Sequence, residues 1–82
     1  MPIQFSGDLD PGQYQEWFTY GWDRSYFVMW SVRPSPGQVG NVSLRALSVE
    51  AAQDGTLTYW LTVWNVGSSR VSVDALYETM PA

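Results

Sequence analysis

Residues 56–65 read TLTYWLTVWN, and this run decides the fold class of the chain. β-Branched and aromatic residues fill it, which predicts a β-strand, and successive side chains of a strand point to opposite faces. The two faces carry Leu57, Tyr59, Leu61 and Val63 on one side and Thr58, Trp60, Thr62 and Trp64 on the other. Neither face is polar, so the strand must bury or present apolar surface on both sides.

Five similar runs, separated by turns rich in Gly, Pro, Asn and Asp, complete the pattern. Strands are predicted at residues 3–8, 13–20, 26–33, 41–51, 56–65 and 70–78. Asp54-Gly55 predicts a hairpin between the fourth and fifth strands. Near Arg45 and Ala46 the apolar alternation slips by one position, which predicts a β-bulge. No long stretch has the 3.6-residue period of an amphipathic helix, so no substantial helix is expected.

Six strands in 82 residues predict a single-domain, all-β fold. We expect a compact six-stranded antiparallel β-sandwich, with a small, partly open barrel as the alternative. Strands 56–65 and 70–78 are expected to pair in one sheet because the connection between them is short. The chain has no Lys to protect exposed sheet edges, which favours a homo-oligomer paired through edges or faces.

The composition argues against several classes of function. The chain lacks Cys, His and Lys and has a net charge of −4. The usual residues of acid–base catalysis and zinc sites are therefore missing, so we expect no enzyme, no cofactor and no metal. Asp8 and Asp10 share a turn that could contribute to calcium binding, but the loop lacks further acidic ligands.

Charge and hydropathy also limit the partners. Four scattered Arg in an acidic chain argue against nucleic-acid binding, which needs clustered cations. No apolar stretch reaches the roughly 18–20 residues of a membrane span. The first residues show no signal peptide, which leaves a cytoplasmic location or export with the leader removed or without a classical leader.

Two stretches resemble known β-sandwich modules. Residues 5–18, FSGDLDPGQYQEWF, resemble the opening of bacterial extracellular modules of the pre-peptidase C-terminal type, where a turn precedes an aromatic strand. Residues 61–73, LTVWNVGSSRVSV, resemble the hairpin of bacterial immunoglobulin-like adhesion modules. The resemblance implies a sandwich fold and an accessory role. It carries over no binding residue, because these modules share no site motif.

The tryptophans of residues 56–65 mark the candidate site. Trp60 and Trp64 share one face and lie about 13 Å apart along the strand. Flat aromatic rings suit the apolar C–H faces of sugars, whose hydroxyl groups need polar partners nearby. If strands 13–20 and 70–78 flank strand 56–65, polar residues can supply those partners, among them Gln13, Arg70 and Glu78. The predicted ligand-binding residues are Trp17, Trp60, Trp64, Gln15 and Asp74.

Three interpretations of Trp60 and Trp64 follow. They stack on carbohydrate in a lectin-like, non-catalytic module, or they form the interface of a self-assembling homo-oligomer, since interfaces are rich in Trp. In the third interpretation both belong to the core, with the strand covered on each face. An enzyme is the weakest class, because only carboxylates remain as catalytic groups.

Overall fold

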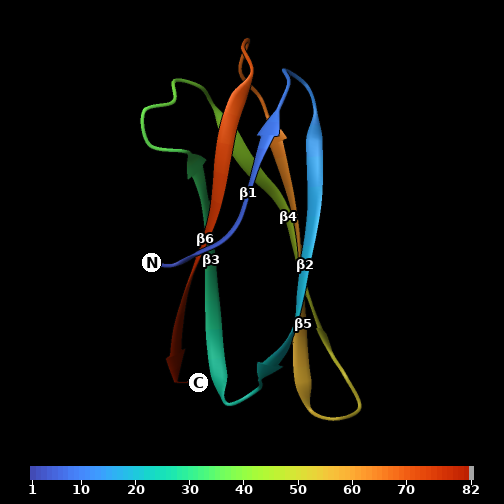
Figure 1. Cartoon of the computed structure of the whole chain (residues 1–82). Helices are drawn as coiled ribbons and strands as arrows, with labels where there is room; N and C mark the ends of the chain where they lie inside the picture. The colour runs from blue at the N-terminus through green and yellow to red at the C-terminus, as the bar shows by residue number, and fades with distance from the viewer. Residues whose placement is uncertain (82) are drawn as a thin grey trace.

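A computed structural model describes residues 1–81 as six antiparallel strands, with no helix in that range (Figure 1). The strands are β1 (Ile3–Leu9), β2 (Tyr14–Asp23), β3 (Tyr26–Pro34), β4 (Val42–Ala51), β5 (Thr56–Asn65) and β6 (Val71–Pro81). All six predicted strands are confirmed, and the architecture is a compact sandwich of two three-stranded sheets rather than a barrel. Within the same residues, no helix has the length and apolar character needed to cross a bilayer.

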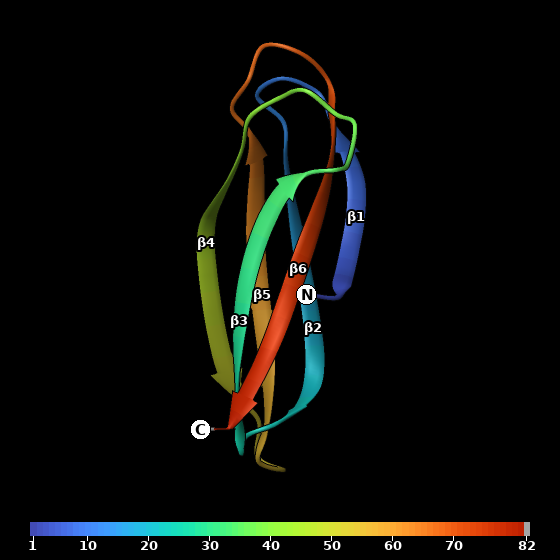
Figure 2. The ribbon, with the colours of Figure 1, turned by 90° about the vertical axis from the view of Figure 1, so that its left-hand side faces the viewer.

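The two sheets each place one long, apolar strand at the centre. Sheet A has the order β1-β6-β3, and sheet B has the order β2-β5-β4. Figure 1 shows the two sheets side by side as two layers. Figure 2 shows β4 along one border of the molecule and the connection between β3 and β4 arching over one end. The molecule is elongated, with extents of 42 × 21 × 15 Å.

The predicted pairing of strands 56–65 and 70–78 in one sheet is wrong. β5 and β6 lie in different sheets, and the short connection between them crosses from one layer to the other. This arrangement sets their apolar faces against each other, so that Val63 of β5 and Val73 of β6 share one buried cluster with Leu9. Pairing within one sheet would have left each strand without the other as a cover for its apolar face.

The second half of the core is aromatic. Val28, Tyr59 and Leu61 form its buried centre, and Trp22, Trp30 and Tyr77 are among the half-buried residues packed around them. The closest edge-to-face contact joins Trp22 and Tyr77, whose ring centroids are 5.2 Å apart. Aromatic packing of this kind supplies a small domain with buried area that aliphatic side chains alone would not.

Turns and irregularities fall largely where the sequence indicates. The register of β4 against β5 shifts between Leu44 and Ala46, which confirms the predicted bulge. Gly55 has a φ of 85°, as the hairpin between β4 and β5 requires. β2 extends beyond its predicted end at residue 20, because Gly21, with a φ of 79°, lies in a register shift within the strand rather than in a turn.

Candidate binding surface

The outer face of sheet B carries a group of aromatic side chains turned away from the core. Residues directly opposite each other in a sheet share a face, and Trp60 and Trp64 lie opposite Phe18 and Tyr14 of β2. Tyr20 stacks on Phe18 at a centroid distance of 6.4 Å and so belongs to the same surface. We call this group the outer aromatic face: Tyr14, Phe18, Tyr20, Trp60 and Trp64.

Trp64 has both faces of its ring covered. Tyr14 stacks on it from β2, with ring centroids 4.7 Å apart and an interplanar angle of 27°. The guanidinium carbon of Arg45 lies 4.9 Å from the ring centroid of Trp64. Because β5 runs between β2 and β4, the tyrosine and the arginine approach from opposite sides. Trp64 therefore has no free ring face for a ligand.

Trp60 is covered on one side only. Phe18 stacks on it from β2 at 5.0 Å, whereas its neighbour on β4 is the small side chain of Ser48. Trp60 is 36% exposed. The ring face turned toward β4 is thus left open, with Thr62 next along β5 and Glu50 next along β4 on the same face of the sheet.

Only two of the five predicted ligand-binding residues, Trp60 and Trp64, lie together on this surface. Trp17 points into the sandwich, where it stacks on Phe5 at 5.2 Å with an interplanar angle of 9°. It packs so closely over Gly7 that a Cβ there would lie 3.2 Å from its ring. Trp17 is an odd-numbered residue of β2, and between residues 14 and 20 the outer face takes the even-numbered ones, so grouping Trp17 with Trp60 and Trp64 does not match the fold.

Gln15 and Asp74 lie outside the outer aromatic face as well. Gln15 shares the inward parity of Trp17, and its amide donates to the backbone oxygen of Glu16 at 3.0 Å. Asp74 lies in sheet A, because β6 does not flank β5. The same topology removes Arg70 and Glu78 from the surroundings of Trp60, and Arg70 is paired instead with Asp10 at 2.7 Å.

Sequence reasoning missed the residues that complete the surface. Tyr14, Phe18 and Tyr20 alternate along one strand, which indicates a shared face, but the pattern does not say that this face is outward. Arg45 and Ser48 become part of the site only because the bulge in β4 sets their positions against Trp64 and Trp60. Those positions depend on the register of β4 against β5, and a single sequence does not contain it.

Asp74 is a buried carboxylate that joins three strands. The hydroxyl groups of Ser35 and Ser6 donate to its Oδ1 at 2.8 and 2.9 Å, and Arg33 lies 3.6 Å from its Oδ2. Chiefly through the Ser35 bond, and further through Ser6 and Arg33, the pKa of Asp74 is lowered below its ordinary value despite burial, which acts in the other direction. The arrangement links β1, β6 and the end of β3 and leaves the carboxylate closed to a ligand.

Asn65 has the equivalent role at the end of sheet B. Its amide donates to the backbone oxygens of Leu9 and Ser69, both at 2.9 Å, and its Oδ1 accepts from the backbone N–H of Gly67 at 2.9 Å. The side chain is fully buried, and these three bonds account for most of its hydrogen-bonding capacity. Asn65 therefore holds the connection that crosses between the sheets.

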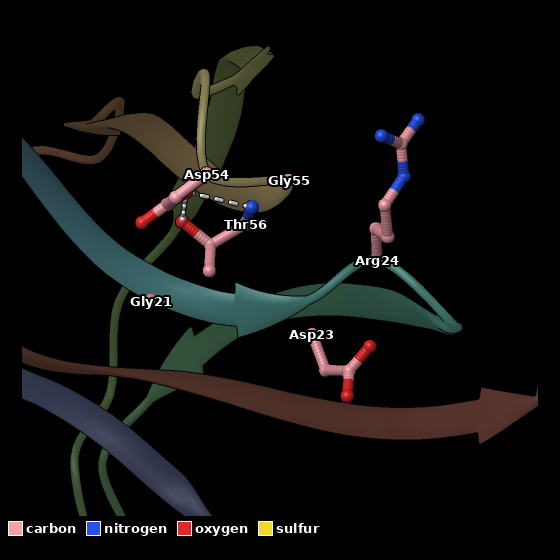
Figure 3. A pocket seen from close by; sticks show the side chains of 6 residues that line it. All are labelled: Gly21, Asp23, Arg24, Asp54, Gly55 and Thr56. Carbon is pink, nitrogen blue, oxygen red and sulfur yellow. Dashed lines mark hydrogen bonds between the residues drawn. The ribbon is translucent and has the colours of Figure 1, made fainter.

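A shallow hollow at the opposite end of the molecule holds two carboxylates that turn formation already uses (Figure 3). It is lined by Gly21, Asp23, Arg24, Asp54, Gly55 and Thr56. Asp54 accepts from the backbone N–H and the hydroxyl of Thr56 at 2.9 and 2.7 Å, and Asp23 accepts likewise from Ser25. The backbone bonds above all lower the pKa of both carboxyl groups, so each stays ionised as a turn-stabilising acceptor.

No group of three or more His, Cys, Asp or Glu side chains within residues 1–81 is arranged to hold a metal ion. Comparison of the chain with known protein families, with curated proteins and with solved structures finds no match. The resemblance to bacterial sandwich modules stays a prediction.

Proposed function

We propose that this chain is a non-catalytic carbohydrate-binding module, lectin-like in its chemistry, that holds a sugar ring against the open face of Trp60. One observation carries the proposal: Trp60 is stacked by Phe18 on one side and has only Ser48 beside it on the other. A flat, apolar surface next to small and polar side chains has the two properties that a pyranose requires.

The neighbours of Trp60 suit the polar part of a sugar. The C–H groups on one face of a pyranose pack on the indole ring, and removing that apolar surface from water favours the complex. The hydroxyl groups at the sugar's rim then need donors and acceptors, which Ser48, Thr62 and the carboxylate of Glu50 supply along the sheet. One stacked ring with a few hydrogen bonds corresponds to an affinity in the millimolar to high micromolar range.

The acids on this surface also favour binding over hydrolysis. Glu16 lies opposite Thr62 and Glu50 opposite Thr58. The two acids are therefore on the two edge strands of sheet B and are offset from each other by four residues along the strand direction. Strand spacing and rise put their backbones roughly 16 Å apart. Paired catalytic carboxyl groups of glycosidases lie about 5–10 Å apart.

The NMR chemical shifts of the indole N–H groups of the five tryptophans provide the test. Soluble oligosaccharides of glucose, mannose, xylose and N-acetylglucosamine, each titrated to millimolar concentration, should shift the signal of Trp60 and leave that of Trp30 in the core unchanged. Trp60→Ala should abolish binding. Tyr20→Ser, on the same face but away from the open ring, is the matched control and should bind like the unchanged chain. No shift of Trp60 with any glycan at millimolar concentration would refute the proposal.

Self-association through the outer aromatic face is the second candidate. Tyr20 is 75% exposed, and exposed aromatic groups of this size mark interaction surfaces. In this case sedimentation should show an oligomer that Phe18→Ser and Trp60→Ala both dissociate, without any response to glycans. A monomer at millimolar concentration would exclude it.

A further inference from the structure

The second half of β4 has apolar side chains that the sandwich leaves uncovered. Leu47 and Val49 lie opposite Leu61 and Tyr59, which are both buried, so all four point to the core side of sheet B. Yet Leu47 is 47% exposed and Val49 is 53% exposed. Both residues belong to an edge strand of sheet B, and β4 runs along one border of the molecule (Figure 2).

The remaining edge strands are less suited to pairing with another chain. β1 is short and contains a register shift, and β2 is interrupted by the shift between Thr19 and Trp22. The inward side chains of Val28, Trp30 and Val32 in β3 are already buried or half-buried against the core. By contrast, residues 46–51 of β4 contain no Pro, Gly or Lys and show no further irregularity. Natural edge strands normally carry such protection.

We propose that β4 pairs antiparallel with β4 of a second copy of this chain, around a two-fold axis at Ser48. Sheet B of one copy and sheet B of the other then join into one continuous sheet of six strands. In this register Leu47 lies opposite Val49 of the second copy, and the reverse pair repeats it across the axis, because a two-fold interface uses the same patch twice. The four half-exposed side chains cover one another on the core side of sheet B.

Charge supports the same register. In this register Glu50 lies opposite Ala46 of the second copy, next to that copy's Arg45, so two equivalent Glu–Arg ion pairs flank the axis. Moving the axis to Val49 would carry Glu50 away from Arg45 and place it opposite Ser48. Moving it to Leu47 would set Glu50, on the outer face, opposite the inward-facing Leu44. The register at Ser48 is the one that satisfies both the apolar and the charged side chains.

The dimer would also change the sugar site, and this part of the inference rests on the proposed function. The open ring face of Trp60 is turned toward β4, so in the dimer the open ring faces of the two Trp60 side chains are turned toward each other. Three strand spacings separate the two β5 strands, about 14 Å. The surface between the rings is formed by the small side chains of Ala46 and Ser48 from both copies, so one extended glycan can contact both tryptophans.

Sedimentation velocity from micromolar to millimolar protein tests the dimer. We expect a dissociation constant in the micromolar range, since a short strand pair buries less than the roughly 1,600 Å² of a standard interface. Val49→Lys, a charge pointing inward at an edge, should give a monomer throughout. Val39→Lys is the matched control: Val39 is 89% exposed in the connection between β3 and β4, and the variant should dimerise normally.

A charge exchange tests the register independently of folding. Arg45→Glu and Glu50→Arg should each weaken dimerisation about tenfold, and the double variant should restore it to nearly the original value. A monomeric parent chain at millimolar concentration, a Val49→Lys variant that still dimerises, or a double variant without recovery would each overturn the proposal. If the dimer forms as described and no glycan binds, the sugar proposal fails and the dimer stands. If the Val49→Lys monomer binds glycan as tightly as the parent, the two-sided sugar site is wrong.

Discussion

Replacing the buried carboxylate of Asp74 by the amide in Asp74→Asn should lower the free energy of unfolding by about 2–3 kcal/mol at neutral pH. Asp74 accepts two hydroxyl bonds, from Ser35 at 2.8 Å and Ser6 at 2.9 Å. Hydrogen bonds to a charged group contribute about 1.5–3 kcal/mol each, and neutral ones about 0.5–1.5 kcal/mol. The difference, counted twice, gives the magnitude. Arg33 adds little, because its side chain is half exposed.

The same carboxylate makes stability depend on pH, and the sign follows from its lowered pKa. The folded chain holds the pKa of Asp74 below 3.8, the value of an unperturbed aspartate, which is expected for the unfolded chain. Its contribution is therefore complete above about pH 4 and is lost as the pH falls through the folded-state value. Asp74→Asn has no such group, so the gap between parent and variant should narrow in acid.

Urea unfolding followed by tryptophan fluorescence measures both effects. With a slope near 1 kcal/mol per molar urea, the midpoint of Asp74→Asn should fall by about 2–3 M at pH 7. Arg33→Gln is the control, and it should shift the midpoint by less than about 1 M. A loss under about 0.5 kcal/mol for Asp74→Asn, or a gap from the parent that stays constant between pH 7 and pH 3, would refute the assigned role.

Three further predictions concern the core and its connections. Asn65→Ala should lower the free energy of unfolding, measured in urea, by about 2–4 kcal/mol, because two backbone carbonyls and one N–H lose their partner at a fully buried position. A loss below about 1 kcal/mol would contradict this. Trp30→Phe should lower the free energy of unfolding by at least about 1 kcal/mol less than Trp22→Phe does. The buried indole N–H of Trp30 has no partner within residues 1–81, whereas that of Trp22 donates to a threonine hydroxyl. Equal losses of stability would contradict this. Gly40→Ala should lower the melting temperature through about 1–3 kcal/mol of overpacking, because its Cβ would lie 2.8 Å from a methyl group of the buried Val71; an unchanged melting temperature would show that the contact relaxes freely.

The sequence predicted part of the candidate site. The even face of β5 stands out because Trp60 and Trp64 occupy positions that a self-sufficient strand would give to polar residues. Their separate roles do not stand out: Trp64 is enclosed by Tyr14 and Arg45, and Trp60 is open beside Ser48. The difference depends on β2, which is distant from β5 in the chain, and on the bulge in β4, which sets Arg45 and Ser48 beside the two rings.

Local sequence patterns by themselves determined the strands of this protein, the hairpin at Gly55 and the bulge in β4, and the composition shows that the chain has no His, Cys or Lys side chains. Each of these follows from alternation, turn residues or composition within a few positions. Only the tertiary structure decided that β5 and β6 lie in different sheets, that Trp17 packs inside on Phe5 and that Leu47 and Val49 remain uncovered. These outcomes depend on which distant strands become neighbours and in what register. Burial of apolar surface across the whole chain sets that choice, and no single segment encodes it.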